Sequence, residues 1–123
     1  MFATRSLLAC ILLLAGCAAV APPPRAAPDP AVAERIRQLS DDNTCGNAIA
    51  GTLTAYHIPP SQIVSITRFV SVVGNHSFFD QNQAEAWLKL ANHGGNIVVT
   101  YSPQTCWIDT VYARDGAMLP TTG

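Results

Sequence analysis

Charged residues are scarce in this chain, and they are not gathered into patches. Seven lysines and arginines and eight aspartates and glutamates are spread over 123 residues, without a basic run. Proteins bind nucleic acids chiefly by neutralising phosphates with basic side chains. The sequence therefore gives nucleic-acid binding no electrostatic basis and predicts a weakly acidic domain.

Familiar motifs of catalysis and metal binding are missing as well. The chain has neither a Gly-x-Ser-x-Gly turn, which would present a nucleophilic serine, nor a Cys-x-x-Cys redox pair. His57, His76 and His93 have no second histidine or cysteine at metal-ligand spacing, so we expect loop histidines. The sequence predicts no catalytic residue, no metal and no cofactor.

Asp109 keeps one enzymatic alternative open. Aspartate is depleted in strands, yet Asp109 falls inside a predicted strand beside Trp107. A position on a solvated outer face is the simpler interpretation. The alternative is a small cell-envelope hydrolase that uses Asp109, although a glycosidase needs two converging carboxylates.

Long apolar runs are also few, and the prominent one lies near residue 1. Residues 6–14 follow Arg5 and lead into the small residues Ala15 and Gly16. This is the layout of an export signal. The run is shorter than the roughly 20 residues that cross a bilayer as a helix. The sequence thus predicts export without a membrane-spanning helix.

The end of this run resembles the lipobox of bacterial lipoproteins, in which Leu, a small residue and Gly or Ala precede an invariant Cys. Residues 14–17 read Leu-Ala-Gly-Cys. The resemblance implies that signal residues 1–16 are removed and that Cys17 receives a diacylglyceryl group and an acylated amino terminus. Each buried methylene contributes about 0.8 kcal/mol, so several acyl chains, such as palmitate, hold a protein on a membrane.

The residues after Cys17 indicate which membrane the protein is sent to and how the domain is linked to it. Ala18, in place of Asp, implies the outer membrane in preference to the inner one. An ordinary signal peptide cut near Ala19 or Ala21, which leaves a soluble periplasmic protein, is the alternative. Residues 17–30 are rich in Ala and Pro and are expected to form an extended spacer.

Residues 31–123 are expected to form a single small domain with one disulfide. Cys10 leaves with the signal and Cys17 is used for lipid, so Cys45 and Cys106 remain as a pair in an oxidising compartment. A bridge that closes a loop of roughly 60 residues is worth about 4 kcal/mol. Free thiols, a redox pair and metal ligands are the alternatives.

Hydrophobic periodicity predicts an α+β fold in the order ααβαββ, with about three helices and a small three-stranded, mostly antiparallel sheet. The expected helices cover residues 30–39, 45–56 and 81–91, and the expected strands cover residues 62–73, 96–101 and 105–113. The third helix is indicated by a capping-box pattern at Asp80 and Gln83 and by four apolar residues at helical spacing: Ala84, Trp87, Leu88 and Ala91. A short return strand at residues 77–79 is an alternative after the turn at residues 74–77.

The C-terminal hairpin supplies a candidate binding surface that combines aromatic and polar residues: Tyr101, Trp107, Asp109, Tyr112 and Arg114. If Cys106 faces the core, then Trp107, Asp109 and Val111 point outward, and an exposed Trp among polar groups is typical of a protein-binding patch. If the third helix covers that face, Trp107 belongs to the core.

These observations favour a lipid-anchored periplasmic protein that is not an enzyme. Its expected partners are membrane lipid, through acylated Cys17, and another envelope protein. A subunit of an envelope assembly and an inhibitor or immunity protein both fit.

Overall fold

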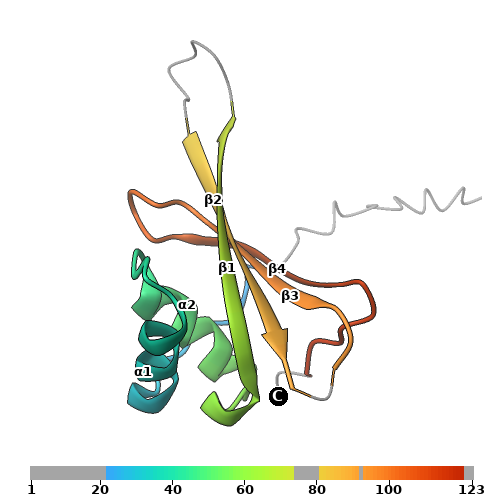
Figure 1. The fold of residues 1–123 in the computed structure, drawn as a ribbon. Coiled ribbons are helices and arrows are strands. Elements are labelled where there is room, and N and C mark those ends of the chain that lie inside the picture. Colours follow the sequence, from blue (N-terminus) through green and yellow to red (C-terminus); the bar gives the residue numbers. More distant parts are fainter. Residues whose placement is uncertain (1–21, 74–80, 92, 121–123) are drawn as a thin grey trace, which may run out of the picture.

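The computed structural model describes residues 22–73, 81–91 and 93–120. The predicted signal, the lipidation site Cys17, His76 and the alternative return strand at residues 77–79 lie outside the described residues. Two helices precede four strands that form an antiparallel sheet in the order β1-β2-β3-β4 (Figure 1).

The elements follow one another closely along the chain. They are α1 (Pro30–Leu39), α2 (Gly46–Ala55), the 3₁₀ turn η1 (Pro60–Gln62), β1 (Ile63–Val73), β2 (Gln81–Leu90), β3 (Asn96–Tyr101) and β4 (Ile108–Arg114). Each strand pairs with the next one in sequence.

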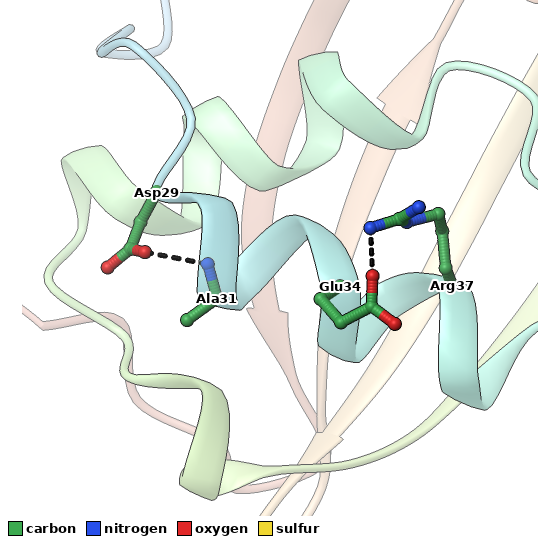
Figure 2. Close-up of polar contacts among 4 residues, drawn as sticks. All are labelled: Asp29, Ala31, Glu34 and Arg37. Atoms are coloured by element: carbon green, nitrogen blue, oxygen red, sulfur yellow. Dashed lines mark hydrogen bonds and ion pairs between the residues drawn. The ribbon is translucent and has the colours of Figure 1, made fainter.

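Helix α1 has the bounds that the sequence predicts, residues 30 to 39. The Asp29 carboxylate accepts a hydrogen bond of 2.8 Å from the backbone N–H of Ala31, and Pro30 occupies the first turn (Figure 2). Glu34 and Arg37 form an ion pair one turn apart on the solvent side (Figure 2). Val32 and Ile36 are buried on the opposite side, so the helix presents one apolar stripe to the sheet.

The predicted third helix is wrong, because residues 81–90 form strand β2. Burial alternates along it: Ala84, Ala86, Leu88 and Leu90 are buried, whereas Lys89 is exposed and Glu85 and Trp87 are partly exposed. The apolar residues of this segment fit the spacing of a helix and also that of a strand. Backbone pairing with β1 on one side and β3 on the other selects the strand. The three-stranded sheet with three helices is therefore replaced by two α-helices and a four-stranded antiparallel sheet.

Both helices lie on one side of the sheet (Figure 1). Val32 and Ile36 of α1 and Ile49 and Leu53 of α2 join one core cluster with the inward residues of all four strands. That set is Ile63, Ile66, Ala84, Ala86, Leu88, Leu90, Ile97, Val99, Tyr101, Ile108, Val111 and Ala113. The opposite face of the sheet is not covered by any helix of the described residues.

The predicted disulfide between Cys45 and Cys106 is confirmed, with Cα atoms 5.1 Å apart. Cys45 is the residue before α2, and Cys106 lies two residues before β4. Both cysteines have positive φ, at 57° and 59°. The bridge thus ties the start of α2 to the start of the last strand.

Residues 25–29 of the expected spacer lie against the domain. The backbone N–H of Asp29 donates to Thr54 Oγ1 at 3.0 Å. A Cβ atom on Gly51 would meet Ala26 O at 2.6 Å, so the chain passes directly over this glycine of α2. The Arg25 guanidinium carbon lies 3.7 Å from the ring centre of Trp107.

Candidate protein-binding surface

Strand register builds a row of side chains across the uncovered face of the sheet. Thr67 pairs with Trp87, Trp87 with Val98, and Val98 with Tyr112. Val98 is 0% exposed, although it lies on the face without helices and outside the helix-side core. Its two cross-strand neighbours, Trp87 and Tyr112, are large enough to shield it from solvent. The face therefore carries a small apolar layer of its own.

Aromatic and cationic contacts extend this layer diagonally over the strands. The rings of Phe69 and Trp87 meet edge to face, with centroids 5.8 Å apart and planes at 77°. On the other side, the Arg114 guanidinium carbon lies 5.1 Å from the Trp87 ring centre. Trp87 Nε1 donates to Glu85 Oε2 at 2.8 Å, which fixes the indole in its plane. We call Phe69, Trp87, Tyr112 and Arg114 the aromatic strip.

The strip is accessible as well as ordered. Phe69 is 49% exposed and Tyr112 36%, and the Arg114 side chain is 54% exposed. Trp87 is half-buried between them. A large apolar surface on a rigid sheet, edged by polar groups, is the composition that protein-binding sites share.

The structure divides the residues predicted for the binding surface among three places. Tyr112 and Arg114 belong to the strip. Tyr101 does not lie on this surface: it is 2% exposed on the helix side, where its hydroxyl accepts a 2.7 Å hydrogen bond from Arg68 Nη1. Trp107 is 56% exposed, but it precedes β4 and packs against Arg25. The predicted strand at residues 105–113 thus begins three residues later than expected.

Asp109 occupies the solvated outer-face position that the simpler interpretation gave it. It is exposed, and its Oδ2 accepts a 3.2 Å hydrogen bond from Gln83 Nε2. The hydrolase alternative gains no geometric support from this environment.

A register shift in the last strand changes which of its side chains face the core, compared with the prediction. Tyr101 pairs with Ile108, whereas the preceding Thr100 pairs with Thr110, so Asp109 is the extra residue of a bulge. Val111, expected to point outward with Asp109, instead packs against the core. The bulge is what brings Tyr112 and Arg114 to the open face.

Phe69 and Trp87 were missed as surface residues. The expected helix at residues 81–91 places Trp87 on its apolar face, and Phe69 falls in the expected strand at residues 62–73, whose apolar residues occupy both faces. The alternation of Glu85, Trp87 and Lys89 with small apolar residues was the available signal, since it has the period of a half-exposed strand.

Two charged side chains contact Trp87 of the strip: Arg114, and Glu85, whose carboxylate accepts from Trp87 Nε1. His57 and His93 are exposed, and within the described ranges no three His, Cys, Asp or Glu side chains come together as metal ligands would. Hydrogen bonds from the Thr44 side chain and backbone N–H hold the pKa of Asp42 below its usual value, with a smaller contribution from Arg68. Asp42 lies in the loop before α2 and not on a strand of the sheet.

Comparisons with family models, with curated proteins and with solved structures gave no match for this chain. Among residues 22–73, 81–91 and 93–120, no helix combines the length and the apolar character that crossing a bilayer requires.

Proposed function

We propose that the chain is a lipid-anchored protein of the bacterial cell envelope that binds another protein and does not catalyse a reaction. Acylated Cys17 is the anchor, and the periplasmic face of the outer membrane is its proposed site. The residues Leu14 to Cys17 support the anchor through their likeness to a lipobox.

The observation that carries the binding role is the aromatic strip on the uncovered face of the sheet. Trp, Tyr and Arg are the residue types that contribute most at protein interfaces. Here Trp87 lies on β2 and Tyr112 and Arg114 lie on β4, and Trp87 is held between Phe69 and Arg114, so its indole loses little freedom when a partner binds. A subunit of an envelope assembly and an inhibitor or immunity protein would both use such a surface.

Recovery of partners from solubilised envelope tests this proposal. The tagged full chain and its Tyr112→Ala variant are compared in parallel, with Met118→Ala as the control, since Met118 is 72% exposed and lies beyond β4. We expect a protein that is recovered with the unaltered chain and with the control, and whose recovery falls about tenfold or more with Tyr112→Ala.

Equal recovery with all three chains would contradict the strip as the binding site. A Trp107→Ala variant distinguishes binding at the aromatic strip from binding at Trp107, because Trp107 lies against Arg25 and outside the strip. Loss of the partner with Trp107→Ala alone would move the site to the beginning of β4.

A further inference from the structure

Within the part of the chain that the structure describes, strand β1 forms one edge of the sheet and pairs with β2 alone. Its register with β2 is unbroken from Ser65 to Val73, after an irregularity at Ile63. Among the described side chains, Arg35 Nε donates to the backbone oxygen of Ile63 at 3.1 Å, at the first residue of the strand. Farther along, a row of backbone N–H and C=O groups on the free side of β1 is left for an additional strand.

The two edges of the sheet differ in how they are protected. Proteins discourage edge pairing with short strands, charges, proline or bulges. The opposite edge, β4, is shorter, carries Asp109 and Arg114, and contains the bulge. By contrast β1 has 11 residues without Pro, Gly, Lys, Asp or Glu. Of the two edges, β1 is the open one.

The single charge of β1 is turned away from its free edge. Arg68 Nη1 donates to Thr44 O at 2.8 Å and to Tyr101 OH at 2.7 Å, on the helix side of the sheet. Its Nε and Nη2 are buried. The exposed side chains of β1 are uncharged: Val64 is 47% exposed, Phe69 49% and Val70 61%, and Ser65 and Thr67 are exposed beside them.

We propose that β1 pairs antiparallel with β1 of a second copy of this chain, which joins the two sheets into one. The occupant of such an edge must be an extended strand, and β1 itself is long and has only uncharged side chains at the exposed positions 64, 65, 67, 69 and 70. A two-fold pairing needs a surface that is complementary to itself.

Charge placement allows this self-pairing. Centred on Thr67, the pairing places Arg68 opposite Ile66 of the second copy. Centred on Phe69, it places Arg68 opposite Val70 and brings the two Phe69 rings together, a favourable cross-strand pair. In both registers no like charges face each other directly. The pairing uses the edge of the sheet, so it does not depend on lipid at Cys17. In the register centred on Thr67 it also leaves Phe69, the member of the aromatic strip on β1, out of the central pair.

Cysteine cross-linking tests the pairing in the full-length chain, whose Cys45 and Cys106 are already joined. Thr67→Cys and Phe69→Cys are oxidised under mild conditions, with Thr110→Cys on β4 as the control for random collision. We expect a disulfide-linked homodimer from Thr67→Cys or Phe69→Cys, at about tenfold the yield of the control. A cross-link to other proteins alone, or equal yields at all three positions, would overturn the proposal.

Thr67→Lys provides a second measurement. Lysine at the centre of an edge strand opposes pairing with another copy, because like charges meet and the edge becomes solvated. Sedimentation velocity should show a concentration-dependent dimer whose dissociation constant rises about tenfold or more in Thr67→Lys, with an unchanged circular dichroism spectrum. A protein that stays monomeric at about 100 μM without the substitution would rule the dimer out.

Discussion

Trp87 and Arg114 lie on β2 and β4, and the Arg114 guanidinium carbon sits 5.1 Å from the centre of the Trp87 ring. Strand β3 runs between them, and its Val98 is fully buried in the register row of Trp87. The contact therefore spans the width of three strands on the face that the helices leave open. It orders a surface that would otherwise consist of separate side chains.

Arg114→Ala is expected to weaken this surface with little effect on folding. A cation–π contact at an exposed site contributes about 0.5–1 kcal/mol, so the free energy of unfolding should fall by no more than that. Denaturant titration of the full chain measures the change. A loss above about 2 kcal/mol would mean that Arg114 supports the fold itself and would weaken its assignment to binding.

Removal of the disulfide is expected to lower the free energy of unfolding far more than Arg114→Ala does. Cys45 and Cys106 are separated by 61 positions in the chain, and closing a loop of that length stabilises by about 4 kcal/mol in the chain-entropy account. The free energy of unfolding should fall by similar amounts in Cys45→Ser, Cys106→Ser and the double variant, as measured by unfolding in denaturant. If the reduced and oxidised forms of the unaltered chain unfold at the same denaturant concentration, this estimate is wrong.

Gly95 and Gly94 form a matched pair for a backbone test. Gly95 has φ of +74°, and a Cβ atom there would meet Arg114 O at 2.1 Å, whereas a Cβ on Gly94 has open space. Gly95→Ala should therefore destabilise by about 2 kcal/mol or more, because strain and overlap add. Gly94→Ala should change stability by less than about 1 kcal/mol. Equal effects of the two substitutions would contradict the close approach to the end of β4.

Lipid at Cys17 is expected to determine where the chain fractionates. Mass spectrometry of the protein made in a bacterial host should find a chain that begins at Cys17 and carries a diacylglyceryl group and an amide-linked acyl chain. Cys17→Ser should move the protein out of the membrane fraction, because no acyl chains remain to bury. An unmodified Cys17 thiol, or a chain that retains residues 1–16, would contradict the anchor.

The sequence predicted those features that depend on local chemistry. Asp29 and Pro30 specify the start of α1, and two cysteines in a domain that is expected to be exported specify a bridge. Each of these depends on neighbouring residues or on composition.

Features that depend on long-range pairing were not predictable in the same way. Residues 81–90 satisfy a helical period and a strand period together, and the choice depends on β1 and β3, which flank the segment only in the folded sheet. The bulge at Asp109 changes the facing of every later residue of β4, and no residue type marks it. Trp87 of the aromatic strip was missed because of the first error.

Site-specific photo-cross-linking in living cells tests the binding surface most directly. A photoreactive phenylalanine analogue replaces Tyr112 on the strip or, as the control, Met118, which is the more exposed of the two at 72% against 36%. Our account predicts one discrete cross-linked partner from position 112 and none from position 118. The absence of any cross-link at position 112, or the same products from both positions, would contradict the conclusion that this face binds a protein.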